Sequence, residues 1–249
     1  MEQPLPSAPL FQSSAYSPLS RMGERARPLD PRPGSEGLVS HGSGVRIAPQ
    51  PEEPVELGVR ESSSPLPRTG EGLGVRAPAV RVGVISDTHI AAVGSRRVIP
   101  PAVLEAFREV DLILHAGDAT CRAVLDRLAS LAPVQAVTGN VDEPELAYEL
   151  PTARLVHLGG ISIGLTHGHL GDGPTTPQRA LRRFAGVHDL RAVVFGHSHE
   201  PSNEARHGPH GDVLLFNPGS PTERRRQPRP SFGLLTVRDG TVRGEVVYL

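Results

Sequence analysis

Five short polar groups stand out along the second part of the chain, each directly after an apolar stretch. They are Asp87-Thr88-His89, Gly117-Asp118, Gly139-Asn140, His167-Gly168-His169 and Gly196-His197-Ser198-His199. In an open α/β sheet the loops at the carboxyl ends of the strands form the ligand site, so we expect these side chains to lie close together. Carboxylate, carboxamide and imidazole ligands suit Mn, Fe, Ni, Co or Zn better than Ca or Mg. The lack of thiolates among them argues against a purely structural zinc site.

Each of these groups is weak evidence when it is taken alone. A Gly-Asp or Gly-Asn pair is more often a simple turn, and a single histidine is more often packed in a core or exposed on a surface. Five groups in succession, each at the end of a predicted strand, are much less easily explained by turns and packing. The sequence therefore favours a metal site built from several loops.

The elements that must position these groups alternate between strand and helix. Apolar runs predict strands at 80–86, 111–114, 134–137 and 192–195, and helical spacing predicts helices at 101–110, 119–130 and 176–184. A hairpin is expected at 154–158 and 161–165 around Gly159-Gly160. Further strands are expected at 212–216, 232–237 and 242–248. This order predicts an α/β fold with mixed sheets flanked by helices, and it does not give the strand order.

Residues 1–79 differ sharply in composition from the rest of the chain. They hold 13 of the 26 prolines, together with much Gly, Ser and Arg and no sustained hydrophobic period. Such a segment buries too little apolar surface to offset the entropy of ordering, so we predict a disordered low-complexity extension. Two alternatives stay open: the true start of translation lies further downstream, or the segment is a disordered arm that recruits a partner. Residues 80–249 are then a single folded domain.

Charge and cysteine content exclude several classes of function. The net charge of −1 leaves no broad basic field, so nucleic acid is not an expected partner. Cys121 is the single cysteine, which rules out a disulfide framework and fits a reducing cytosol. The chain shows no run of eighteen apolar residues and no basic segment followed by an apolar one at its start. We therefore predict a cytoplasmic protein without a membrane segment, and we leave its oligomeric state open, including a homodimer or larger assembly.

From about residue 82 to residue 249 the chain resembles the calcineurin-like metallophosphoesterases. The resemblance is to their short phosphodiesterase branch, which also includes the phosphoesterase-like subunit of retromer. The matching phrases are Ile85-Ser86-Asp87-Thr88-His89, His115-Ala116-Gly117-Asp118, Thr138-Gly139-Asn140, Leu165-Thr166-His167-Gly168-His169 and Asn217-Pro218-Gly219-Ser220. The resemblance implies a metallo-dependent phosphatase fold, a four-layer α/β/β/α sandwich of two mixed sheets with the metals at one edge.

Carried over residue by residue, the resemblance also implies a set of seven ligands for two divalent ions. One ion would take Asp87, His89 and His199, the other Asn140, His167 and His197, and Asp118 would bridge them. Manganese is the favoured metal, with nickel, iron, cobalt or zinc as alternatives. Two ions about 3.5–4 Å apart need an anionic bridge and can share a hydroxide whose pKa falls toward about 7. That hydroxide would attack phosphorus in line, while Asn140 and the metals offset charge on the phosphoryl oxygens.

One position departs from the family pattern. Many members follow Gly-Asn with a histidine that protonates the leaving group, and here Val141 stands in that place, followed by Asp142. A valine donates no proton, so our candidate donor is His169; the alternative is that His169 only hydrogen-bonds a metal ligand. An enzyme without the usual acid favours activated leaving groups. We therefore predict a phosphodiesterase for small, nucleotide-like substrates, although a monoesterase or nuclease would use the same centre.

The other polar residues have plainer expectations. We expect His115 to pack beneath the Asp118 loop or beside a ligand, Cys121 to be a small buried apolar residue, and Asn217-Pro218-Gly219 to be a supporting turn. Residues 224–226, three arginines, are either a solvated loop or a local basic patch for anionic substrates. A protein-binding scaffold of the same fold is the competing function, but scaffolds lose ligands freely and none of the seven is missing. Slow hydrolysis that serves sensing or regulation is a third possibility.

Overall fold

The computed structural model describes residues 78–208 and 211–249. The predicted extension over residues 1–79 lies outside the described residues except for its last two. The described residues form two sheets of five strands each, with four short α-helices.

The first sheet has the strand order β10-β9-β1-β2-β3. Its strands are β1 (Val80–Ile85), β2 (Leu112–His115), β3 (Val134–Ala136), β9 (Ser231–Arg238) and β10 (Thr241–Tyr248). β1, β2 and β3 are parallel, whereas β9 is antiparallel to both β1 and β10. His115 at the end of β2 lies opposite Ile85 of β1 and Ala136 of β3, so the three parallel strands end level with one another. The loops that follow them leave the sheet at the same edge.

The second sheet has the strand order β4-β5-β6-β8-β7. Its strands are β4 (Ala153–Leu158), β5 (Ile161–Thr166), β6 (Leu190–Val194), β7 (Ser202–Gly208) and β8 (Gly211–Asn217). β5, β6 and β8 are parallel, and the antiparallel strands β4 and β7 form the two edges. The predicted hairpin is present as β4 and β5. Both residues of its Gly159-Gly160 turn have positive φ, at 56° and 78°, as a two-residue type I′ turn requires.

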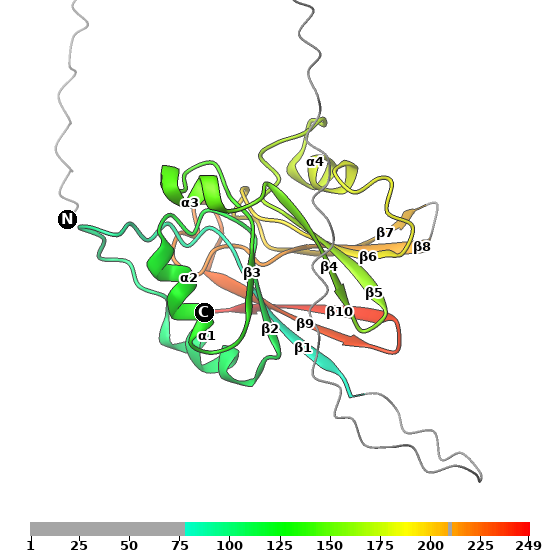
Figure 1. Cartoon of the computed structure of the whole chain (residues 1–249), viewed down its shortest axis with the longest axis horizontal. Helices are drawn as coiled ribbons and strands as arrows, with labels where there is room; N and C mark the ends of the chain where they lie inside the picture. Colours follow the sequence, from blue (N-terminus) through cyan, green and yellow to red (C-terminus); the bar gives the residue numbers. More distant parts are fainter. Residues whose placement is uncertain (1–77, 209–210) are drawn as a thin grey trace, which may run out of the picture. The chain divides into compact units, whose positions relative to one another are not determined.

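The main hydrophobic core lies between the two sheets. It joins Val82 and Val84 of β1 with Ile163 and Leu165 of β5 and Val194 of β6. Two further cores lie on the outer faces, and Figure 1 shows α1, α2 and α3 beside the first sheet and α4 beside the second. The order of layers is therefore helix, sheet, sheet, helix. The predicted four-layer α/β/β/α sandwich of two mixed sheets is confirmed.

The helices are shorter than the sequence pattern suggests. They are α1 (Pro101–Ala106), α2 (Arg122–Ala129), α3 (Pro144–Glu149) and α4 (Thr176–Arg182), and α1 continues into a 3₁₀ turn over Phe107–Glu109. The predicted start of α2 at residue 119 is wrong, because Thr120 has a φ of 78° that no α-helix accommodates. Thr120 instead pairs with Ile90 in an isolated bridge between two site loops. Among the described residues, no helix is long and apolar enough to cross a bilayer.

Two elements, β7 and α3, were not predicted from the sequence. Residues 202–207 of β7 are polar or small and mostly exposed, so the strand carries no alternating apolar signal. Its position depends on its ladder with β8, which runs from Ser202–Asn217 to Gly208–Gly211. The helix α3 has six residues and a single buried side chain, Leu146, too few to give a helical period.

Candidate metal centre

The five polar groups follow five strands whose carboxyl ends face a common edge of the sandwich. Asp87 and His89 follow β1, Asp118 follows β2, and Asn140 follows β3. His167 follows β5, and His197 and His199 follow β6 of the second sheet. The structure brings the side chains of all seven residues together, through the contacts described below. The assignment of particular residues to particular ions stays a prediction.

The backbone at these residues is unusual. In the described part of the chain, eight non-glycine residues have positive φ, and five of them belong to the predicted ligand set. Their φ angles are 55° at Asp87, 47° at His89, 57° at Asp118, 67° at His197 and 58° at His199. Side chains with a Cβ visit this region rarely, and such conformations persist where the surrounding structure enforces them, often at functional sites. The sharp turns aim five ligand side chains inward immediately after the strand ends.

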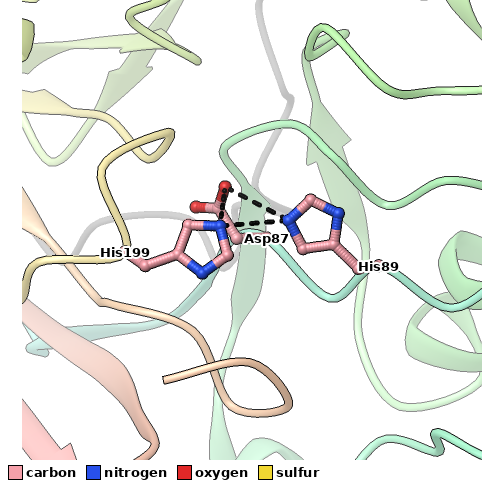
Figure 2. A group of neighbouring side chains, drawn as sticks. All are labelled: Asp87, His89 and His199. Carbon is pink, nitrogen blue, oxygen red and sulfur yellow. Dashed lines mark hydrogen bonds and ion pairs between the residues drawn. The ribbon is translucent and has the colours of Figure 1, made fainter. Parts of the chain in front are cut away.

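Asp87, His89 and His199 form one compact group, which Figure 2 shows. Nε2 of His199 lies 3.2 Å from Oδ1 of Asp87, and Nε2 of His89 lies 3.8 Å from the same oxygen. The two Nε2 atoms are 3.0 Å apart, and the imidazole rings are stacked. Oδ1 of Asp87 is fully buried and accepts no hydrogen bond. A cation between these three atoms would satisfy all of them.

The remaining ligands face one another in a second group. Nε2 of His167 lies 3.2 Å from Oδ2 of Asp118 and 3.2 Å from Oδ1 of Asn140. Nδ1 of His197 lies 3.0 Å from the same Asn140 oxygen. Oδ2 of Asp118 also lies 3.8 Å from Nε2 of His89 in the first group. The Asp118 carboxylate therefore stands between the two groups, where a bridging ligand would be needed.

The tautomers of two histidines are set by backbone carbonyls. Nδ1 of His199 lies 2.6 Å from the carbonyl oxygen of Glu223, and Nδ1 of His167 lies 2.7 Å from that of Ala116. A carbonyl only accepts, so both Nδ1 atoms carry the proton, and in the neutral ring Nε2 presents a lone pair. Each of these lone pairs faces a carboxylate oxygen at 3.2 Å. Two facing lone pairs require a positive charge between them, either a second ring proton or a metal ion.

Burial and opposite charge shift the proton equilibria of the site. Burial raises the pKa of Asp118. The hydrogen bond and the charge of a doubly protonated His167, together with the bond from the Val141 N–H, outweigh burial and hold this pKa far below its usual value. Burial likewise raises the pKa of Asp87, and the neighbouring His199 and His167 turn this into a net lowering. For His167 burial lowers the pKa, and the Asp118 and Asp87 carboxylates raise it overall. The buried carboxylates are thus ionised and draw a cation to this point.

Two glycines are required by the close approach of the carboxylates. A Cβ at Gly139 would collide with Oδ1 and the backbone nitrogen of Asp118. A Cβ at Gly196 would collide with Oγ of Ser86 and with Oδ2 of Asp87. Any side chain at either position would push a ligand carboxylate out of place.

Several residues outside the ligand set hold the site loops together. Asp142 accepts hydrogen bonds from the backbone N–H of Thr120 at 2.7 Å and of Gly139 at 2.6 Å, and so joins the loops of Asp118 and Asn140. Nδ2 of Asn217 donates to the carbonyl of Gly196 at 3.1 Å, in keeping with the predicted supporting turn. The sequence pattern marked Asp142 only as the residue after Val141. Its position two residues after the Gly139-Asn140 pair was the feature of the sequence that could have indicated its role.

The residues discussed for proton transfer lie beside the second group. The His169 ring centroid is 5.2 Å from that of His167, and Nδ1 of His169 is buried without a hydrogen bond. Burial, with the nearby His167 and His197, lowers the pKa of His169 to about 4, so the ring is neutral at pH 7. Val141 is 45% exposed, and its backbone N–H donates to Oδ1 of Asp118 at 3.0 Å.

The other singled-out residues occupy plain structural positions. His115 is fully buried beneath the Asp118 loop, with Nε2 3.4 Å from Oγ1 of Thr88. Cys121 is buried as a small core residue. His157, for which the sequence offered no partner, pairs through Nδ1 with Oγ of Ser162 at 2.9 Å, and that hydroxyl donates to Asp189. In this trio serine, not histidine, is the middle member, so the arrangement does not activate a nucleophile.

Comparison with protein families identifies the superfamily and supports the fold. A model described as the calcineurin-like phosphoesterase superfamily domain matches residues 80–240. The chain belongs to this superfamily. The resemblance stated from the sequence motifs is confirmed. The protein is accordingly a metal-dependent phosphoesterase, and divalent ions fit the buried carboxylate, amide and imidazole ligands described above.

Two archaeal relatives agree with this assignment. A probable metallophosphoesterase of Methanothermobacter thermautotrophicus is 39% identical over 168 residues, which are 67% of this chain and 91% of that protein. A probable metallophosphoesterase of Methanocaldococcus jannaschii is 39% identical over 159 residues, 64% of this chain and 76% of that protein.

Solved structures with the same fold include a Thermotoga maritima protein, with 28% identity and a TM-score of 0.51 over 68% of this chain and 99% of that one. Vps29 of Chaetomium thermophilum has 24% identity and a TM-score of 0.52, over 68% of this chain and 97% of its own. At that identity the likeness concerns the fold alone.

Proposed function

We propose that residues 80–249 hydrolyse small phosphodiesters with two divalent ions bound by the seven converging residues. The observation that carries this proposal is the pair of buried carboxylates that face histidine lone pairs at 3.2 Å, with one carboxylate oxygen of Asp87 left without a hydrogen bond. A buried carboxylate without a partner is costly, and a bound cation removes that cost.

Asp87, His89 and His199 hold one ion in this proposal, Asn140, His167 and His197 hold the other, and Asp118 lies between them. When bound, two such ions lower the pKa of a water molecule toward neutrality and offset charge on the phosphoryl oxygens. The Nδ1 bonds of His167 and His199 to backbone carbonyls keep both rings oriented, which supports preorganised ligation. Manganese is the metal we propose, because mixed oxygen and imidazole ligands suit it, and iron, nickel, cobalt and zinc remain alternatives for a metal analysis.

The preference for diesters rests on the leaving-group side of the site. Val141 stands where many family members have a histidine acid, and His169 is neutral at pH 7, which makes it a weak acid. His169 remains our proposed donor, and its other role would be to orient a metal ligand. Without a strong acid the site hydrolyses esters whose leaving groups depart unprotonated. This chemistry supports activated or nucleotide-like diesters over ordinary monoesters.

The test is hydrolysis by the purified protein with Mn²⁺. We expect a higher kcat/KM on bis-p-nitrophenyl phosphate than on p-nitrophenyl phosphate. Asp118→Ala should remove the activity, and Asp126→Asn, a change at an exposed carboxylate on α2, should leave it unaltered. Faster turnover of the monoester would overturn the diester preference. Activity that survives Asp118→Ala would overturn the proposed centre.

The competing function is a protein-binding scaffold of the same fold. A scaffold would keep its partners in Asp118→Ala, whereas the enzyme loses turnover. The complete and buried ligand set favours the enzyme, because a scaffold gains nothing from five strained ligand residues. The cytoplasmic location predicted from the sequence stays a prediction.

A further inference from the structure

A loop that supplies none of the proposed ligands lies against the metal centre. It follows β8 and spans residues 220–225. Oγ of Ser220 donates to the carbonyl of Asp87 at 2.7 Å, and Oγ1 of Thr222 donates to that of Thr88 at 2.6 Å. The carbonyl of Glu223 accepts the bond from Nδ1 of His199. Three contacts therefore fix this loop to the backbone of Asp87 and Thr88 and to the ring of His199.

The carboxylate of Glu223 holds two arginines at the rim of the centre. Nη1 of Arg97 lies 2.9 Å from Oε2 of Glu223 and donates to the carbonyl of His89 at 3.4 Å. Nε of Arg225 lies 3.8 Å from Oε1 of Glu223, and its Nη1 donates to the carbonyl of His197 at 3.3 Å. The Arg97 and Arg225 side chains are 44% and 47% exposed. Each guanidinium thus touches the backbone of a predicted ligand and remains accessible to a bound molecule.

The backbone of Arg225 is itself strained, with a φ of 49°. Besides the five ligands, the non-glycine residues with positive φ in the described ranges are Thr120, Arg225 and Asp239. Thr120 belongs to the Asp118 loop, and Asp239 lies in the turn between β9 and β10. Arg225 is the remaining case, and its conformation directs the side chain back to His197. Strain of this kind persists where the surroundings enforce one conformation.

The charge balance of the filled centre calls for an anion with more than one charge. Asp87 and Asp118 offset two of the four charges of two divalent ions, and the proposed shared hydroxide offsets a third. The Arg97–Glu223–Arg225 cluster adds one further positive charge, which leaves two in all. Glu223 offsets only one of the two arginine charges, so a further anion beside Arg97 and Arg225 would be stabilised. A simple phosphodiester brings a single negative charge to the ions and leaves the arginine cluster uncompensated. Arginine forks bind phosphate oxygens in a bidentate manner.

We infer that Arg225 and Arg97 bind a second phosphate group, carried on an ester arm of the phosphodiester substrate. This inference rests on the proposed function, because it takes the metal centre as the position of the scissile phosphate. The substrate class is then a nucleotide-like diester with a further terminal phosphate, in preference to a diester with uncharged arms.

The test is equilibrium binding to the full chain loaded with Mn²⁺, measured by titration calorimetry. The probes are thymidine 3′,5′-bisphosphate and thymidine 5′-monophosphate, which differ by one phosphate group. We expect the intact protein to bind the bisphosphate about tenfold more tightly, the lower end of what hydrogen bonds to charged groups contribute. In Arg225→Gln the ratio of the two affinities should fall by about tenfold. Arg226→Gln, a change at the exposed neighbouring arginine, should keep the original ratio.

Two results overturn the inference. One is an affinity ratio within twofold of unity in the intact protein, and the other is an unchanged ratio in Arg225→Gln. If circular dichroism shows that Arg225→Gln does not fold, Arg97→Gln takes its place, and the ratio of its affinities for the bisphosphate and the monophosphate is used in the same way. Hydrolysis of the p-nitrophenyl 5′-esters of the two nucleotides separates this inference from the proposed function. If the protein binds the bisphosphate more tightly but hydrolyses neither ester, the proposed function is rejected and the second phosphate site is kept. If it hydrolyses the esters but binds both nucleotides equally, the proposed function is kept and the second phosphate site is rejected.

Discussion

Val141 is the position at which a proton donor can be added with little disturbance. Its backbone N–H already donates to Oδ1 of Asp118 at 3.0 Å, and its side chain is 45% exposed. Val141→His keeps the N–H bond and requires no space in the core, so we expect the free energy of unfolding to change by less than about 0.5 kcal/mol. The new imidazole would stand beside Asn140, next to the proposed position of the departing group.

A positioned general acid contributes about 10²–10⁴-fold, and a half-exposed one belongs at the lower end. We therefore expect Val141→His to raise kcat/KM about 100-fold on phenyl phosphate, whose leaving group needs a proton. On p-nitrophenyl phosphate, whose leaving group is activated, the rise should be below about threefold. Because the imidazolium is the acid, the gain should be full at low pH and disappear as the pH rises through about 6.5, the ordinary pKa of histidine.

The assay is the ratio of kcat/KM between Val141→His and the original protein on both esters, from pH 5 to pH 8.5 with Mn²⁺. Taking ratios cancels the pH dependence of metal binding that both proteins share. Val141→Gln, which is polar and of similar length but not an acid, is the control. An equal gain on the two esters, or a gain that persists at pH 8.5, would refute the assignment of this position to leaving-group protonation.

Three further predictions concern the framework of the centre. Gly139→Ala places a Cβ against Asp118, so we expect a loss of about 1–3 kcal/mol in unfolding free energy and a lower metal content by elemental analysis. Gly186 has open space around it, so the control Gly186→Ala should change neither quantity. Asp142→Asn weakens the bonds from Thr120 and Gly139, and we expect metal affinity to fall about tenfold in a Mn²⁺ titration; an affinity equal to that of the original protein would contradict this role. Burial lowers the pKa of His115 to about 4, below the value of about 6.5 in the unfolded chain. The stability that comes from its neutral form is therefore fully present above about pH 6.5. Up to about 3 kcal/mol of it is lost as the pH falls toward 4. In urea unfolding of the metal-free chain, the stability difference between the original protein and His115→Gln should therefore shrink from pH 7 to pH 4, and a constant difference would show that His115 is not buried as a neutral ring.

The sequence was sufficient for most of the strands that lead into the centre, because they are buried apolar runs that end at a polar motif, whereas β3 is short and only partly buried. Val82 to Ile85 of β1 and all of β5 are buried, and such strands cannot be mistaken for exposed ones. The division of strands between two sheets was beyond the sequence, since pairs such as β1 with β9 join residues far apart in the chain. β7 was missed because its position follows from pairing with β8, not from its own composition.

The ligand types were readable because each follows a predicted strand and stands next to a glycine or two residues from another ligand. The supporting contacts carry no such signal. Ser220, Thr222 and Glu223 touch the centre through hydroxyls and a backbone carbonyl, and their polar sequence has no period to mark them. From the sequence, the three arginines at residues 224–226 fit either a solvated loop or a basic patch. The structure separates them, because Arg225 contacts the His197 carbonyl while Arg224 bonds to the backbone of Gln227 in its own loop.

The seven proposed ligands are divided between the two sheets, and each proposed ion would draw on both. Asp87 and His89 come from the loop after β1 and meet His199 from the loop after β6, while Asn140 after β3 meets His167 and His197 after β5 and β6. Bound metal ions would therefore cross-link the two sheets of the sandwich, as disulfides do in secreted domains. The single cysteine of this chain cannot form an internal disulfide. A ligand at 100 times its dissociation constant adds about 2.7 kcal/mol to stability. Chelation should then loosen the contact between the sheets, and the melting temperature would report how full the centre is.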